Sequence, residues 1–180
     1  HTGGIDDGFG FSGFLPGEAL QTLEESLTYP KDTNMGEPHG VTVVREPGTT
    51  MSYSSAGYTV LQLLIEEVTN RPFADYMKDA VLQPLGMTKS SFDLEVIVAE
   101  GRTHDLATSF DRDLKSHPHR RYTAQAAVSL RATPHDLAQF VLAYTGENPV
   151  LRQETLEQMM TPQPGDRGNL GFGSNALRCE

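Results

Sequence analysis

The residues of this sequence best suited to chemistry are three consecutive hydroxyl-bearing side chains, Tyr53, Ser54 and Ser55. They precede a stretch with helical hydrophobic spacing, so Ser54 or Ser55 is expected to cap that helix by accepting a free backbone N–H. A phenol and two hydroxyls side by side can each donate and accept a hydrogen bond. The plainer interpretation is a capping turn whose tyrosine packs on the core. Taken alone, the three residues favour that plainer interpretation.

Two serine-hydrolase motifs are incomplete in this chain. Ser55-Ala56-Gly57 supplies the second half of a G-x-S-x-G nucleophile elbow, but Tyr53 stands where the first glycine is required. No serine begins an S-x-x-K motif. Thr28-Tyr29-Pro30-Lys31 has that spacing, yet its proline breaks the helix that would bring both side chains to one face. The sequence therefore contains no recognisable nucleophilic serine.

Nucleotide and metal sites are also disfavoured. Residues 8–13 match G-x-G-x-x-G, but a dinucleotide site needs a strand before the motif and the preceding residues do not form one. His117 and His119 lie near two aspartates, in a segment without periodicity and among basic residues. A solvated loop explains them better than a rigid ligand set. We expect no metal and no cofactor.

Composition excludes several further classes of protein. The 180 residues carry 14 Lys and Arg against 24 Asp and Glu, a formal charge of −10. This balance argues against nucleic acid or an anionic membrane as the main partner. No apolar run approaches the roughly 20 residues of a membrane-spanning helix. Cys179 is the only cysteine, so an internal disulfide or a cysteine-based zinc site is impossible.

The elements that must position these residues are mainly helical. We expect Leu61, Leu64, Ile65 and Val68 to form the buried stripe of the helix after Ser55, and Leu137, Phe140, Val141 and Tyr144 that of a helix capped by Thr133. Hydrophobic periodicity and turn signals predict helices over 16–27, 55–70, 73–81, 133–144 and 152–160, strands over 41–45 and 169–173, and a long connection over 88–125 with one short element near 94–99.

The stretch 46–92 resembles the middle of the class C β-lactamase and penicillin-binding-protein-like serine hydrolases, including the related esterases. The family pattern P-G-x-x-x-x-Y-S-N-x-G-Y is matched at Pro47, Gly48, Tyr53, Ser54, Gly57 and Tyr58. The pattern continues through Arg71-Pro72-Phe73 and Pro84-Leu85-Gly86-Met87. Residues 1–4 are similar to its early H-T-S-G loop, residues 126–140 to its A-A-G-G-L-x-S-T-x-x-D-L-A-x-F segment, and 159–163 and 171–173 to its next helix and strand entry.

The resemblance implies roles for two residues. Tyr53 would be the catalytic general acid and base, sharing a proton with the lysine of an S-x-x-K motif upstream of His1. Ser55 would position substrate or that lysine. Ser55 stands where β-lactamases and peptidases have Asn, which favours ester hydrolysis over β-lactam or peptide hydrolysis because a hydroxyl is shorter than an amide and has one proton. Val128 replaces a usual glycine.

The resemblance implies an α+β fold of the β-lactamase/transpeptidase type, with residues 1–180 forming a partial domain that is mostly its helical subdomain. The S-x-x-K segment and the third motif, K-T-G or H-T-G, would lie outside, so the chain alone is expected to be inactive. The parent would form acyl-enzymes on small esters, amides or β-lactams. Family members are often exported, which is compatible with a periplasmic location. The alternatives are a non-catalytic binding or regulatory module of the same fold and an unrelated helical interaction domain.

Overall fold

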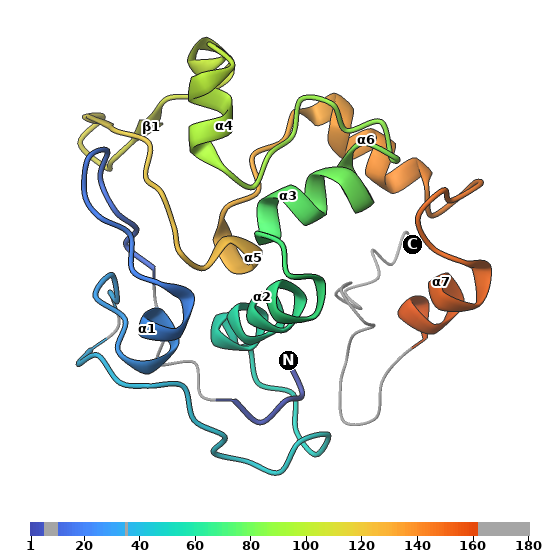
Figure 1. Cartoon of the computed structure of the whole chain (residues 1–180), viewed down its shortest axis with the longest axis horizontal. Coiled ribbons are helices and arrows are strands. Elements are labelled where there is room, and N and C mark those ends of the chain that lie inside the picture. The colour runs from blue at the N-terminus through green and yellow to red at the C-terminus, as the bar shows by residue number, and fades with distance from the viewer. Residues whose placement is uncertain (6–10, 35, 162–180) are drawn as a thin grey trace.

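The computed structural model describes residues 1–5, 11–34 and 36–161, and helices dominate this part of the chain. Figure 1 shows the α2 helix near the middle of the molecule, with the N-terminus of the chain in front of it. Short turns and one small hairpin complete the architecture. The helices are α1 (Leu23–Thr28), α2 (Ser55–Thr69), α3 (Phe73–Met77), α4 (Leu94–Ala99), α5 (Gln125–Val128), α6 (Pro134–Leu142) and α7 (Gln153–Met160).

The α2 helix begins where the sequence predicts and ends one residue earlier. Ser54 is its N-cap, with extended backbone and a side-chain oxygen that accepts the N–H of Gly57 at 3.0 Å. Asn70 ends the helix in the left-handed conformation, at φ 50°. The asparagine side chain tolerates this region better than most residues do.

The buried face of α2 is not the one that hydrophobic spacing predicts. Ala56, Thr59 and Gln62 are buried, whereas Leu61, Leu64 and Val68 are exposed and Ile65 is partly exposed. The Gln62 side chain explains this orientation, because it donates to the carbonyl of Thr123 at 3.1 Å and accepts from the N–H of Ala126 at 3.0 Å. Its two bonds satisfy the backbone at the start of α5, which packs on α2.

Two predictions near the N-terminus are only partly right. The first helix covers Leu23–Thr28 rather than 16–27, because Thr22 and Glu25 form a reciprocal capping box that begins the helix later. The expected strand over 41–45 is a single antiparallel bridge between Ile5 and Val43. A strand needs a continuous partner, and here only one pair is formed.

The second half of the chain follows the prediction more closely. α3 continues into a π-helical turn, η1 (Lys78–Leu82), so the predicted amphipathic segment is present. Thr133 caps α6 by accepting the N–H of Asp136 at 3.1 Å. In its expected stripe, however, Leu137 and Val141 are exposed. α4 supplies the short element expected near 94–99, whereas the expected strand over 169–173 lies outside the described residues.

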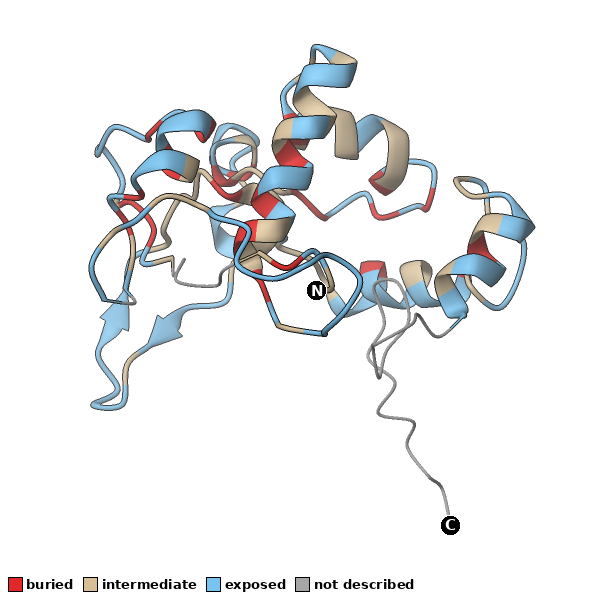
Figure 2. Ribbon diagram, turned by 90° about the horizontal axis from the view of Figure 1, so that it is seen from below, coloured by how far each residue is buried: buried red, intermediate tan, exposed pale blue. Residues whose placement is uncertain are grey.

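The long connection predicted over 88–125 contains a 3-10 turn, η2 (Thr103–Asp105). A hairpin of β1 (Ser109–Phe110) and β2 (Ser116–His117) follows this turn. The two strands are antiparallel, with Ser109 opposite His117. Figure 2 shows both strands in the colour of exposed residues, projecting from the helical body. None of the described helices is long and apolar enough to cross a membrane.

Two clusters of buried apolar side chains stand out among the described residues. One joins the end of η1 to α6 through Leu82, Leu85, Met87 and Ala143. The other joins α2 to α5 through Ala56 and Ala124, with Ile5 and Val41 packed against it. The second cluster therefore ties the N-terminal residues to the mouth of α2.

Candidate active site

Tyr53 and Ser55 lie together at the N-terminal mouth of α2, as the sequence predicts for neighbouring residues of one capping turn. The Tyr53 side chain is 60% exposed, so its ring is not packed into the core. Its hydroxyl oxygen accepts a hydrogen bond from the hydroxyl of Ser55, at 3.2 Å. The phenol is therefore open to solvent and held next to a second hydroxyl.

His1 packs against this pair, although sequence analysis assigns it no role beyond the H-T-S-G resemblance. The centre of its ring is 4.6 Å from that of Tyr53, with 33° between the planes, and 5.4 Å from that of Tyr58. Its Nδ1 accepts the backbone N–H of Ser54 at 3.1 Å. An imidazole nitrogen accepts only when it carries no proton, so this bond requires a neutral ring with its proton on Nε2.

Backbone hydrogen bonds hold His1 in place. Its carbonyl accepts the N–H of Ser52 at 2.8 Å, and the carbonyl of Thr2 accepts the N–H of Gly48 at 2.7 Å. Gly4 has φ +68° and lies against the carbonyl of Arg45, where any Cβ would collide with the oxygen. Glycine is needed at this position both for its conformation and for its size. The 1–5 segment is thus docked along 45–54.

The described residues supply no cationic group to the Tyr53 hydroxyl. Its only hydrogen-bond partner in this part of the chain is Ser55, and its ring contact is with His1. A free phenol ionises near pH 10, so base catalysis at neutral pH needs a nearby positive charge. Among the described residues, the Tyr53 hydroxyl therefore has no hydrogen-bonded lysine or arginine that could favour its ionised form.

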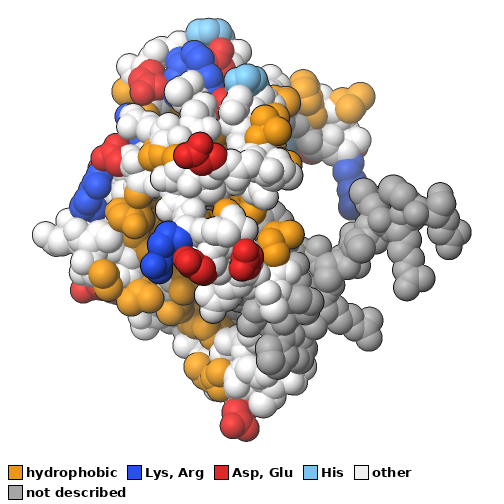
Figure 3. Space-filling model, turned by 90° about the vertical axis from the view of Figure 1, so that its right-hand side faces the viewer, with side chains coloured by type: hydrophobic (Ala, Val, Ile, Leu, Met, Phe, Trp, Pro, Cys, Tyr) orange, Lys and Arg blue, Asp and Glu red, His pale blue; other side chains and the backbone are white. Residues whose placement is uncertain are grey.

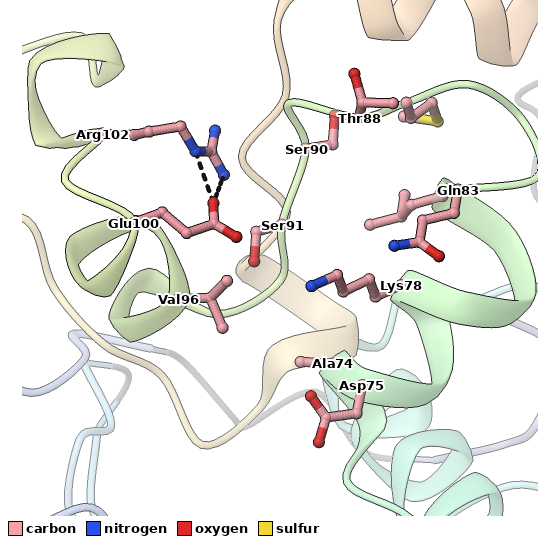
Figure 4. Close-up of a pocket in the computed structure, with 12 residues that line it drawn as sticks. Ala74, Asp75, Lys78, Gln83, Thr88, Ser90, Ser91, Val96, Glu100 and Arg102 are labelled. Carbon is pink, nitrogen blue, oxygen red and sulfur yellow. Dashed lines mark hydrogen bonds and ion pairs between the residues drawn. The ribbon is translucent and has the colours of Figure 1, made fainter.

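Two cavities lie elsewhere, and neither is lined by Tyr53 or Ser55. A small one, of about 90 Å³, lies between α3, η1 and α4. Figure 4 shows Lys78 extending into it from η1 and Arg102 paired with Glu100. A larger one, of about 650 Å³, is bounded by residues 102–109, 117–122 and 128–134.

The histidines near Asp111 form a contact but no ligand set. His117 Nε2 lies 3.6 Å from an Asp111 carboxylate oxygen, next to the hairpin. Within the described ranges, no group of three or more His, Cys, Asp or Glu side chains could hold a metal ion.

Comparison with known proteins identifies the family of this arrangement. A family model described as Beta-lactamase matches residues 1–176. The chain belongs to the beta-lactamase family. Members of this family are serine hydrolases that act on β-lactam, amide and peptide substrates. The resemblance stated from residues 46–92 is thereby confirmed.

Solved structures show the same fold. The octameric penicillin-binding protein homologue of Pyrococcus abyssi is 26% identical with a TM-score of 0.60, over 83% of this chain and 32% of that one. A penicillin-binding protein from Bacillus halodurans is 19% identical with a TM-score of 0.64, over 90% of this chain and 48% of that one. A D-amino acid amidase from Ochrobactrum anthropi SV3, complexed with L-phenylalanine amide, is 20% identical with a TM-score of 0.64. The match covers 91% of this chain and 48% of the amidase.

These similarities confirm the α+β fold of the β-lactamase/transpeptidase type expected for the parent. The beta-lactamase-family chain spans less than half the length of each of the three structures. Its described residues are mainly helical, and the described strands are short.

Sequence reasoning missed two features of this beta-lactamase-family chain. The contact of His1 with Tyr53 joins residues far apart along the chain, and only the similarity of residues 1–4 to the H-T-S-G loop gave a signal for it. The basic lining of the larger cavity comes from residues 89, 102, 120 and 131, which share no spacing. The only sequence signal for this basic lining was the charged composition of the connection over 88–125.

Proposed function

We propose that this chain is the helical part of a serine hydrolase that acts through an acyl-enzyme on small esters or amides, with Tyr53 as general acid and base. The observation that supports this proposal is the exposed Tyr53 phenol, bonded to the Ser55 hydroxyl at the mouth of α2, in a chain of the beta-lactamase family. A phenol that served only the core would be buried.

The proposed chemistry takes place in the intact protein. A serine outside the 180 residues attacks the substrate carbonyl and gives up its hydroxyl proton, which the Tyr53 oxygen and a neighbouring lysine take up. The tetrahedral intermediate collapses to an ester on that serine, and the proton passes to the departing alcohol or amine. Water then adds to the acyl-enzyme with the same groups as base, releasing the acid and the free serine.

Ser55 is proposed to set substrate preference. Its hydroxyl already donates to the Tyr53 oxygen, so it is close enough to align the phenol or a substrate carbonyl. A hydroxyl has one proton to donate, whereas the amide found at this position in β-lactamases and peptidases has two. We therefore propose that esters are preferred over β-lactams and peptides.

The test compares Tyr53→Phe with Tyr29→Phe in the intact protein. Tyr29 is 56% exposed and lies after α1, so it is matched to Tyr53 in type and exposure. With nitrocefin and a p-nitrophenyl ester, Tyr53→Phe should lower kcat about 100-fold or more, because general acid–base catalysis contributes about 10² to 10⁴. Tyr29→Phe should leave it unchanged. Equal turnover by the two variants would refute the role of Tyr53.

The 180-residue chain alone should show no covalent labelling by a fluorescent penicillin or a fluorophosphonate, because it lacks an S-x-x-K serine. Labelling of this chain would contradict the proposed division of the site. An intact protein that folds, binds a β-lactam reversibly and forms no acyl-enzyme would support the alternative of a non-catalytic binding module.

A further inference from the structure

The larger cavity has a charge opposite to that of the chain that contains it. Its volume of about 650 Å³ is in the range of small-molecule sites. Four lysine and arginine side chains line it against a single carboxylate, Asp105. The whole chain has the reverse balance, 14 basic residues against 24 acidic. The basic side chains at the cavity are Lys89, Arg102, Arg120 and Arg131, and two histidines, His117 and His119, add further imidazole groups.

Three of these four cations form no ion pair with a carboxylate of the described residues. Arg102 is neutralised by Glu100 at 2.6 Å and lies 4.0 Å from Asp105. Arg120 donates to the carbonyl of Gly13 at 3.1 Å, which carries no charge. Among the residues the structure describes, Lys89, Arg120 and Arg131 form no ion pair.

Arg131 is fixed in position beside the cavity. Its backbone forms an antiparallel bridge with Ser91, and its guanidinium donates to the carbonyls of Ser129 at 3.1 Å and Arg120 at 2.7 Å. Burial lowers the pKa of Arg131, opposed by Tyr122 and Asp93. The guanidinium donates only to neutral carbonyls, and the attraction of Asp93 offsets the loss of water only in part, so an arriving anion would stabilise it further.

The site is separate from the Tyr53 hydroxyl pair. Neither Tyr53 nor Ser55 lines the cavity. The only α5 residue in its lining is Val128, and α5 packs on the buried side of α2, which carries Ala56 and Gln62. Asp136 follows the cavity-lining residues Thr133 and Pro134, but its carboxylate is buried and has other partners. It accepts from the N–H of Lys89 and from the hydroxyl of Ser90, both at 2.8 Å. It does not line the cavity.

We infer that this cavity binds a small organic anion carrying at least two carboxylate or phosphate groups. Three cations that form no ion pair among the described residues, placed around one half-open cavity, match two or three negative charges on one ligand. Arginine forks suit the planar carboxylate and the phosphate oxygens alike. The net charge of −10 works against longer polyanions such as nucleic acids, which would contact the acidic surface as well. The inference does not depend on the proposed hydrolase activity.

The test is calorimetric titration of the intact protein with citrate and with inorganic pyrophosphate at low ionic strength. We expect saturable binding of at least one of them. Binding of citrate alone identifies a carboxylate site, pyrophosphate alone a phosphate site, and binding of both the shared chemistry. Raising the salt concentration should weaken binding, because the contacts are between charges. Absence of saturable binding up to about 10 mM, an affinity too weak for a specific site, would overturn the inference.

Matched lysine variants locate the binding. Lys89→Gln should weaken binding about 10-fold, the equivalent of about 1.4 kcal/mol for one charged contact. Lys31→Gln is the control, because Lys31 is exposed and does not line the cavity. Arg120→Gln is a second cavity variant, checked for folding by circular dichroism. Binding that Lys31→Gln weakens as much as Lys89→Gln would show a non-specific surface effect and would overturn the inference.

Discussion

The Tyr53 phenol lies at the surface because Ala56, and not the Tyr53 ring, packs into the core at this end of α2. Ala56 is fully buried one turn later, whereas Tyr53 is exposed and stacked on His1. The resulting group of His1, Tyr53 and Ser55 combines an imidazole, a phenol and a hydroxyl around one helix mouth. In the described part of the chain, His1 accepts from two backbone N–H groups of this turn, those of Ser52 and Ser54, so it holds the turn in position.

Replacing His1 by phenylalanine should loosen this turn. His1→Phe keeps an aromatic ring against Tyr53 but removes the acceptor of the Ser54 N–H, a bond with a net contribution of about 1 kcal/mol. Hydrogen exchange at the Ser54 amide should therefore be about 5-fold faster, as measured by NMR. His135→Phe, an exposed histidine on α6, is the control. Unchanged exchange at Ser54 in His1→Phe would contradict the hydrogen bond.

Asp32 gives a pH-dependent prediction. It is 6% exposed, one oxygen accepts the N–H of Gly13 at 3.2 Å, and the other has no partner in the described part of the chain. Burial raises the pKa of Asp32 above its ordinary value of 3.8, despite the opposing hydrogen bond from Gly13. The unfolded chain then ionises at lower pH than the folded one, so this residue reduces stability progressively as pH rises above 3.8.

Asp32→Asn should therefore become more favourable with increasing pH. The amide can still accept the N–H of Gly13 but does not ionise. The difference in free energy of unfolding, variant minus parent, should rise between about pH 4 and pH 7, as measured by urea denaturation at several pH values. A difference that stays constant or falls over this range would contradict the buried carboxyl.

Among the elements, α6 is joined to the 89–91 segment by a single buried carboxylate. Asp136 is 1% exposed and accepts from the N–H of Lys89 and the hydroxyl of Ser90. Ser91 and Arg131 form a backbone bridge beside it. These contacts set the position of the α6 start relative to the core cluster of Leu82 and Met87.

Asp136→Asn should lower the free energy of unfolding by about 2 kcal/mol, because both hydrogen bonds go to one carboxylate oxygen, bonds to a charged acceptor contribute about 1.5 to 3 kcal/mol, and the amide oxygen that replaces it is neutral. Asp113→Asn, on an exposed turn of the hairpin, should change it by less than about 0.5 kcal/mol. Urea denaturation of both variants measures the difference. Equal stability of the two variants would be inconsistent with the buried contacts.

In the molecule as a whole, apolar side chains are divided between a modest core and an extensive surface. Figure 3 shows hydrophobic side chains at the surface of one face, interspersed with charged ones. On α2 the exposed fractions are 51% for Leu61, 56% for Leu64 and 76% for Val68. Stability of the 180-residue chain is therefore expected to depend on its buried apolar side chains and little on this α2 face.

Two leucines in the 180-residue chain test this division. Leu82 is 3% exposed in the η1–α6 cluster, so Leu82→Ala should lower the free energy of unfolding by about 2 to 5 kcal/mol. Leu64→Ala removes the same atoms from an exposed site and should lower it by less than about 1 kcal/mol. Denaturant titration measures both values. A larger loss for Leu64→Ala would show that the α2 face is covered in solution.

The sequence by itself determined the family, the starts of α2 and α6, and the identity of Tyr53 and Ser55 as the residues to examine. These features depend on short-range rules: an N-cap hydroxyl, a proline at the first helical position, and motif residues in fixed order. Hydrophobic spacing failed for α1, because the local capping box of Thr22 and Glu25 begins the helix later than that spacing suggests.

Only the tertiary structure decided which helix faces are buried, that His1 lies on Tyr53, and that four distant cations line one cavity. Hydrophobic spacing shows that α2 has an apolar side, but the hydrogen bonds of Gln62 to the start of α5 turn another side inward. Contacts between residues far apart along the chain depend on how the elements pack, and this packing leaves no periodic signal in the sequence.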